Sequence, residues 1–133
     1  MMENKAGAYT TNVVSMDLAL PTLRMIAKTG KPTRCCLEKV HAMPKQGVSS
    51  TFSFGAGYGW LKGAMDTLGI SYQEIPPEKW KKEFSLNSDK QTSIAVCRQL
   101  FPEADLRLTE RSRTDSDGMA EALLMAEYAR RKL

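Results

Sequence analysis

Cysteine and histidine are scarce in this chain, and long hydrophobic runs are absent. The three cysteines, two of them adjacent, form neither a disulfide framework nor a zinc-binding spacing. A single histidine, His41, excludes a metal site built from several imidazoles. No apolar stretch approaches the roughly 20 residues of a membrane-spanning helix, and the opening residues lack the pattern of a signal peptide. We therefore expect a cytoplasmic protein with reduced thiols and no membrane partner.

The length and composition are those of an ordinary soluble domain. With 133 residues, of which 42% are hydrophobic and 26% charged, we expect one domain spanning residues 1–133. The net charge of +4 identifies no partner by itself. Between residues 28 and 45, however, five basic residues surround one acidic residue, Glu38. That arrangement suits a site where a metal ion meets phosphate, and without a further motif a solvated basic face would be the preferred interpretation.

Alternating strand and helix signals predict an α/β sheet that is parallel at least in part. The apolar run Cys35–Leu37 predicts a buried strand, with Glu38 at the carboxyl end where open sheets collect their ligands. A helix is expected from Asp17 to Gly30, and residues 13–16 are either a short strand or the approach to that helix. Further elements are expected as helices at about 51–68, 78–84, 90–100 and 115–131, and as a strand at 70–75.

Hydrophobic spacing predicts which faces of the later helices are buried. In the helix at 90–100 the expected core residues are Ile94 and Cys97. In the last helix they are Met119, Leu123 and Ala126, with Leu124 as a further candidate.

The helix expected at 51–68 has an unusual glycine stripe formed by Gly55, Gly59 and Gly63. Each glycine is about 1 kcal/mol less favourable than alanine inside a helix, so the stripe needs a reason. Close packing of the helix against a sheet is a more economical reason than direct contact with a substrate.

Three sequence phrases carry a family resemblance. They are E-K-V-H-A-M-P-K-Q-G-V-S-S-T-F-S-F-G-A-G-Y-G, then I-P-P-E-K-W-K-K-E-F followed by S-D-K, and S-D-G-M-A-E-A-L-L-M-A-E-Y-A-R-R. Together, from about residue 31 onward, the chain resembles the RuvC-type Holliday-junction resolvases, most closely their phage and prophage branch. The resemblance implies a three-layer α/β fold of the RNase H-like type. It also implies a homodimer that cleaves branched DNA with Mg²⁺ or Mn²⁺.

The resemblance further implies that three carboxylates, those of Glu38, Asp117 and Glu121, are the catalytic metal ligands. Asp117 and Glu121 are one helical turn apart and share a face, where two acids repel unless a cation compensates. Hard oxygen ligands suit Mg²⁺ or Mn²⁺, and two such ions would activate water and stabilise the leaving oxygen. Capping of the helix is the alternative role for Asp117 and for Asp115. Which of these two is the inner ligand stays open, with Asp117 preferred.

A DNA-binding surface is expected in the loop and helix after Glu38 and in a second basic patch. Aromatic side chains among cations suit unpaired bases and phosphates. We assign Phe52 and Phe54 first to the core or to a dimer interface, and Trp80 first to packing. The candidate DNA contacts are Lys39, His41, Lys45, Ser49, Ser50, Tyr58, Lys62, Lys81, Lys82 and Lys90.

The opening part of the family pattern has no counterpart in this chain. The family's first catalytic Asp lies in a phrase like I-G-I-D-P-G, and no such phrase occurs. Only twenty residues separate Asp17 from Glu38, which is room for one helix and not for a hairpin as well. We therefore expect an RNase H-like fold that lacks its first strands and one metal ligand. A truncated start, a true loss and a missing part supplied by a partner chain are the open explanations.

The leading hypothesis is a structure-specific endodeoxyribonuclease that uses two metal ions, with poor activity for these 133 residues alone. A catalytically silent remnant that binds branched DNA is the main alternative. A purely structural α/β protein is a more distant one.

Overall fold

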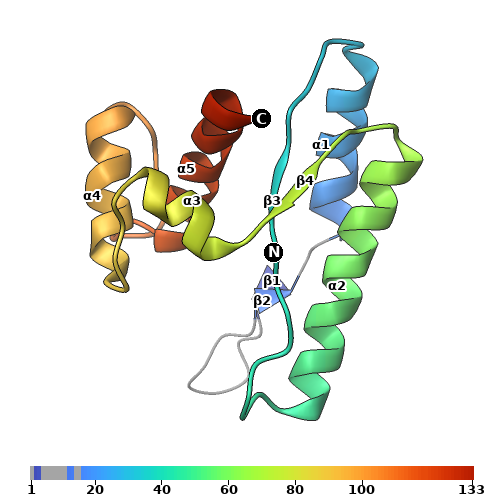
Figure 1. Ribbon diagram of the computed structural model, residues 1–133, viewed down its shortest axis with the longest axis horizontal. Helices are drawn as coiled ribbons and strands as arrows, with labels where there is room; N and C mark the ends of the chain where they lie inside the picture. Colours follow the sequence, from blue (N-terminus) through green and yellow to red (C-terminus); the bar gives the residue numbers. More distant parts are fainter. Residues whose placement is uncertain (1, 4–11, 14–15) are drawn as a thin grey trace. The chain divides into compact units, whose positions relative to one another are not determined.

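The computed structural model describes residues 2–3, 12–13 and 16–133 of the chain (Figure 1). The chain divides into two compact units. Unit 1 comprises Met1–Thr33 and Val40–Ser71, and unit 2 comprises Arg34–Lys39 and Tyr72–Leu133. None of the helices in these described ranges is long and apolar enough to cross a membrane.

Unit 1 is built from two helices and a short antiparallel strand pair. The strands are β1 (Met2–Glu3) and β2 (Asn12–Val13), and the helices are α1 (Met16–Lys28) and α2 (Val48–Thr67). The predicted end of α1 is confirmed, since Gly30 follows it with a φ of 63°, a left-handed conformation that glycine adopts without strain. Of the stretch 13–16, Val13 closes β2 and Met16 opens α1, while Val14 and Ser15 lie outside the described residues.

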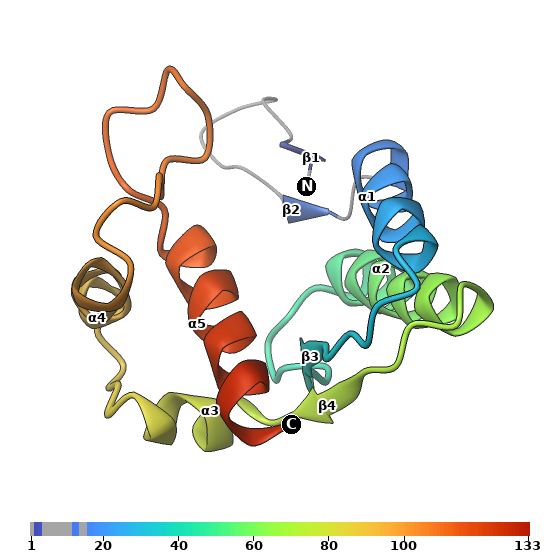
Figure 2. The same ribbon diagram turned by 90° about the horizontal axis from the view of Figure 1, so that it is seen from above.

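Unit 2 joins a parallel strand pair to three helices (Figure 2). Strand β3 (Cys36–Glu38) pairs with β4 (Gln73–Ile75), so that Glu38 lies opposite Ile75. The pair continues where the Lys39 amide donates to the Ile75 carbonyl at 2.8 Å. The helices are α3 (Pro77–Glu83), α4 (Lys90–Leu100) and α5 (Asp117–Lys132), and α5 contacts β3, α3 and α4.

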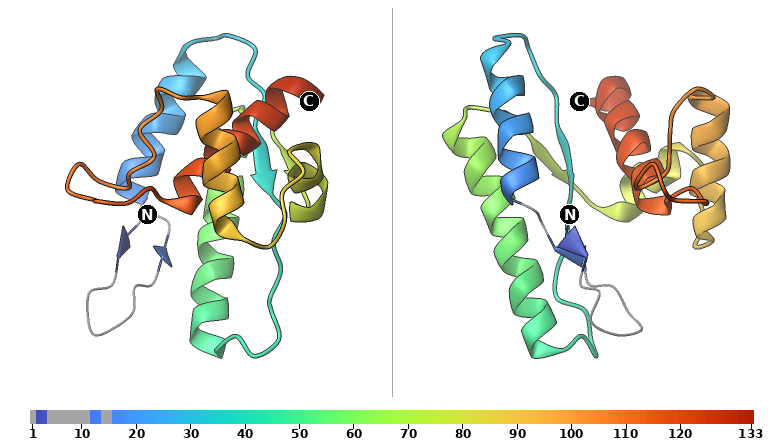
Figure 3. Two further views of the ribbon diagram at one scale, coloured as in Figure 1. Left: turned by 90° about the vertical axis from the view of Figure 1, so that its left-hand side faces the viewer. Right: turned by 180° about the vertical axis from the view of Figure 1, so that it is seen from behind.

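The core of unit 2 forms where these helices meet, and Figure 3 shows α4 in orange beside α5 in red. Its largest fully buried side chains are Trp80, Cys97, Leu106 and Leu124. In α4 the prediction for Cys97 is confirmed, and Ile94 packs against the cluster from a half-buried position.

The predicted inward face of α5 is confirmed for Leu124, which is fully buried, and Leu123 packs half-buried against the core. The prediction is wrong for Met119, which is 39% exposed. Ala126 is also exposed. The buried residues are Ala120, Leu124, Tyr128 and Ala129, and the first three are spaced four apart along one stripe. The small side chain of Ala120 permits close approach of the neighbouring elements. The prediction selected the larger apolar residues and therefore overlooked Ala120.

The expectation of a three-layer RNase H-like fold is wrong. Helices make up 56% and strands 5% of the structure, and the only parallel pairing among the described residues is β3 with β4. The strand expected at 70–75 is confined to Gln73–Ile75, so neither partner exceeds three residues. Two such strands cannot form the central layer that the resemblance implied.

The expected packing of the glycine stripe on α2 is also wrong for the part of the chain that the structure describes. A Cβ added to Gly55, Gly59 or Gly63 would meet no heavy atom within 4 Å. Phe52 is 79% exposed and Phe54 47%, so the core, one of the two places to which they were assigned, is wrong for both, and the dimer interface stays a prediction. The exposed face of α2 therefore carries both glycines and large aromatic side chains.

Gly59→Ala should raise the free energy of unfolding by about 1 kcal/mol, because the helix gains propensity and the new methyl group meets open space. Urea denaturation followed by far-UV circular dichroism measures this. Gly30→Ala is the matched control, and it should lower stability by roughly 1 kcal/mol because of its positive φ. A destabilised Gly59→Ala protein would mean that this face is covered in solution.

Two carboxylates, Glu83 and Glu127, anchor the C-terminal end of α5. Arg131 lies 3.2 Å from Glu83 and 3.0 Å from Glu127, and Arg130 also pairs with Glu127. Hydrogen bonds from Arg130, and then from Arg131, lower the pKa of Glu127 to about 2. The Arg131 hydrogen bond likewise lowers the pKa of Glu83.

Acid should therefore weaken this end of the fold in a defined window. A carboxylate with a depressed folded-state pKa contributes stability above its unfolded pKa of about 4.3, and the contribution is lost as the pH falls through the folded value. The melting temperature should drop between about pH 4.3 and pH 2, and Glu127→Gln should flatten that drop. Glu110→Gln, an exposed carboxylate with no ion-pair partner in the described ranges, should leave the pH profile unchanged. Equal slopes for wild type and Glu127→Gln would contradict this account.

Candidate functional site

Glu38 occupies the last position of β3, and a buried tryptophan holds it there. The indole Nε1 of Trp80 donates a hydrogen bond to Glu38 Oε2 at 2.8 Å. Trp80 is fully buried, whereas Glu38 is half-buried. The local sequence explains the contact, because Pro76 ends β4 in an extended conformation and Pro77 starts α3 at once. The strand partner of Glu38 thus leads directly into the helix that carries Trp80.

Asp117 and Glu121 lie on the first two turns of α5, the helix that contacts β3. The cap of this helix is Ser116, whose hydroxyl accepts from the Met119 amide at 3.3 Å. Neither Asp115 nor Asp117 is therefore needed to cap the helix. Asp117 in the first turn is still favoured by the helix dipole.

Glu121 interacts electrostatically with both of the other carboxylates, Glu38 and Asp117. Burial is the largest cause that raises the pKa of Glu121, and the charges of Glu38 and Asp117 raise it further. The ammonium groups of Lys81 and Lys90 act in the opposite direction. Glu38 and Asp117 thus lie within electrostatic range of Glu121, and we name these three carboxylates the acidic cluster.

Two lysines from different helices flank the acidic cluster. Lys81 Nζ of α3 lies 4.0 Å from Glu121 Oε1, and Lys90 Nζ at the start of α4 lies 3.5 Å from Asp117 Oδ2. Lys81 also lies over the Trp80 ring, 5.7 Å from its centroid. Pairing with lysine offsets the repulsion that three acids at close range would otherwise suffer.

Asp115 is engaged elsewhere. Arg98 of α4 donates to both of its carboxylate oxygens at 2.7 Å, and the same guanidinium donates to the Ala104 carbonyl at 2.9 Å. This bidentate pair ties the segment before α5 to α4. Between the two aspartates that the sequence left open, the structure therefore favours Asp117 as the member of the acidic cluster.

The carboxylate oxygens of the acidic cluster suit a hard divalent cation, but the three side chains are not close together. Carboxylate oxygens are the preferred ligands of Mg²⁺. Yet no group of three or more His, Cys, Asp or Glu side chains in the described part of the chain is close enough to hold a metal ion. The thiol of Cys36, close to Glu38 in sequence, is a poor metal ligand because it stays protonated. Burial, followed by the charges of Cys35 and Glu38, raises its pKa to about 11.

Four of the expected DNA contacts belong to unit 2, and two of them, Lys81 and Lys90, flank the acidic cluster. Lys39 is exposed directly after β3, and Lys90 pairs with Asp117 as described. Lys81 and Lys82 line a cavity of about 570 Å³. Its remaining lining residues are Glu78, Ser85, Leu86, Asn87 and Ser88.

The other expected DNA contacts belong to unit 1. His41 and Lys45 are exposed on the loop before α2, and Ser49 and Ser50 are exposed on its first turn. Further along α2, Tyr58 and Lys62 are half-buried, and Lys62 Nζ lies 5.2 Å from the centroid of the Tyr58 ring. The expected residues thus form two groups, one in each unit.

Sequence reasoning missed two parts of the site. It assigned Trp80 to packing, which is confirmed, but not to the hydrogen bond with Glu38. It also missed the ion pair between Arg98 and Asp115. The signal for Trp80 was its position in a helix that starts immediately after the strand paired with that of Glu38.

Comparisons with known proteins add no relative. No protein-family model matches the chain, and a search of curated proteins found no significant match. The likeness to RuvC-type resolvases therefore stays a resemblance carried by the three sequence phrases.

A double-mutant cycle tests whether Trp80 holds Glu38. Trp80→Phe should destabilise the protein by about 2–4 kcal/mol, because it removes a hydrogen bond to a charged group and some packing volume. Combined with Glu38→Ala, it should show a coupling energy of about 1–3 kcal/mol in urea unfolding. A coupling energy near zero would mean that the indole and the carboxylate act independently.

Proposed function

We propose that unit 2 carries the site of a metal-dependent endodeoxyribonuclease that acts on branched DNA, with Glu38, Asp117 and Glu121 as the metal ligands. The observation that supports this best is the acidic cluster itself: one carboxylate from a strand end and two from one helix face influence one another and are flanked by lysines.

Bound Mg²⁺ or Mn²⁺ would supply an activated water and charge stabilisation of the leaving oxygen. The residues of this chain have separate tasks. Trp80 orients Glu38 through the indole N–H, and Lys81 and Lys90 neutralise Glu121 and Asp117. Glu38, Asp117 and Glu121 would hold the divalent cation, and its charge would leave both ammonium groups available to phosphate oxygens.

The rest of the proposal comes from the resemblance. Branched DNA and a homodimer belong together, because a four-way junction has the two-fold symmetry of such a dimer. Lys82 in its polar cavity and the exposed Lys39 are the proposed phosphate contacts beside the acidic cluster. A cytoplasmic location belongs to the same proposal.

A catalytically silent branched-DNA-binding protein is the second candidate. It is favoured by the open arrangement of acids in the described part of the chain, where no three ligands come together. In that case Lys81 and Lys90 stay paired with Glu121 and Asp117, and the protein binds DNA through its other basic residues without cleaving it.

Cleavage of a synthetic four-way junction in Mg²⁺ or Mn²⁺ decides between the two candidates. Glu121→Gln should slow cleavage by more than about 100-fold, since losing a ligand costs more than the 10–100-fold typical of an outer partner. Glu103→Gln, an exposed acid outside the acidic cluster, is the matched control and should cut normally. A wild-type protein that binds the junction but never cuts it would establish the silent candidate. No preference for the junction over linear duplex would refute both.

A further inference from the structure

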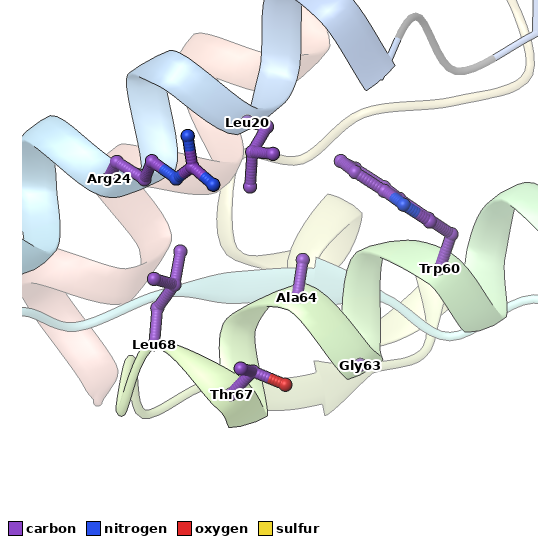
Figure 4. Close-up of a pocket in the computed structure, with 7 residues that line it drawn as sticks. All are labelled: Leu20, Arg24, Trp60, Gly63, Ala64, Thr67 and Leu68. Carbon is purple, nitrogen blue, oxygen red and sulfur yellow. The ribbon is translucent and has the colours of Figure 1, made fainter.

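A second cavity, in unit 1, is separate from the residues of the acidic cluster. It lies between α1 and the C-terminal half of α2 and has a volume of about 410 Å³ (Figure 4). Its lining recurs at helical spacing, from Leu20 and Arg24 on α1 and from Trp60, Gly63, Ala64, Thr67 and Leu68 on or just after α2. We name it the Trp60 pocket.

The polar groups of the Trp60 pocket are hydrogen-bond donors. No acidic side chain lines it, the guanidinium of Arg24 and the indole N–H of Trp60 can only donate, and Thr67 adds a hydroxyl. Within the ranges that the structure describes, neither Arg24 nor Trp60 has a hydrogen-bond or ion-pair partner. A ligand that accepts hydrogen bonds and carries negative charge is therefore complementary to it.

The rest of the lining is apolar and suits a flat ring. Figure 4 shows the Trp60 ring and the Arg24 guanidinium on either side of Leu20, both directed toward the space over Ala64. Gly63 lines the cavity without a side chain, and an added Cβ there would meet nothing within 4 Å. The volume falls in the usual range of small-ligand sites, roughly 300–1,000 Å³.

We propose that the Trp60 pocket binds one unpaired nucleotide of DNA, with the base against Trp60 and the phosphate on Arg24. Stacking on an aromatic side chain and a charge-assisted hydrogen bond to phosphate are the two interactions by which proteins hold single-stranded DNA. A base inside a duplex is stacked on both faces, so only an unpaired one can enter. The identity of the polymer rests on the proposed function, since base pairs at a DNA branch point open more readily than those inside a continuous duplex.

Tryptophan fluorescence offers a direct test. The chain has two tryptophans, and Trp80 is fully buried, so quenching by a short single-stranded oligothymidylate reports on Trp60. The wild type should show saturable quenching. Arg24→Gln should weaken binding about tenfold or more, the value of a hydrogen bond to a charged group. Gly63→Leu should abolish it by filling the cavity, and the fold should survive because leucine is the better helix former.

Lys28→Gln is the matched control, because it removes one positive charge from an exposed position on α1, one turn beyond Arg24 and outside the pocket. It should leave affinity nearly unchanged. If Lys28→Gln weakened the affinity as much as Arg24→Gln does, the effect would be one of overall charge, and the proposal would be overturned. Unchanged binding by Gly63→Leu, an absence of quenching, or equal affinity for an abasic strand would also overturn it.

Two further measurements fix the ligand and separate this proposal from the nuclease. Thymidine monophosphate should bind more weakly than the oligonucleotide, and equal or tighter binding would overturn the assignment to DNA. Glu121→Gln should retain full quenching. Quenching without junction cleavage by the wild type would leave the pocket standing and remove the nuclease, whereas cleavage without quenching would do the reverse.

Discussion

The hydrogen bond from the Trp80 indole to Glu38 ties the candidate site of unit 2 to its core. The indole is fully buried among side chains such as Phe84 and Leu124, so packing fixes its orientation. The carboxylate at the strand end inherits that fixed position, because the 2.8 Å contact leaves little freedom. Any change that repacks the core of unit 2 therefore moves a site residue as well. Stability and site geometry depend on the same side chain.

The second constraint is the repulsion among carboxylates that α5 and β3 bring together. A helix that places Asp117 and Glu121 on one face has to bring a compensating charge, and α3 and α4 supply it through Lys81 and Lys90. Burial is the largest cause of the raised pKa of Glu121, and among the neighbouring charges that of Lys81, which lowers the pKa, acts most strongly. The acidic side chain of α5 that is most affected by burial thus depends on a lysine of α3 for its compensation.

Local sequence rules anticipated the elements better than the architecture. The helix at 90–100 has the bounds expected, and the strand end at Glu38 and the turn between Asp117 and Glu121 were readable from spacing alone. Burial on α2 was not readable, because whether Phe52 faces core or solvent depends on what covers the helix and not on its own periodicity. The three-layer fold failed for a similar reason. The resemblance implied further strands on either side of the one that ends at Glu38. The described sheet of unit 2 has only two strands.

Charge balance explains how a metal ion would prepare the proposed site for DNA. With all groups ionised, the acidic cluster has three negative charges and its two paired lysines have two positive ones, so these five groups together carry one net negative charge. One divalent cation reverses the sign of the sum. In the proposed enzyme a phosphate backbone would then be attracted to this site. In the proposed enzyme, metal binding and DNA binding at this site would therefore favour one another, without any change of fold.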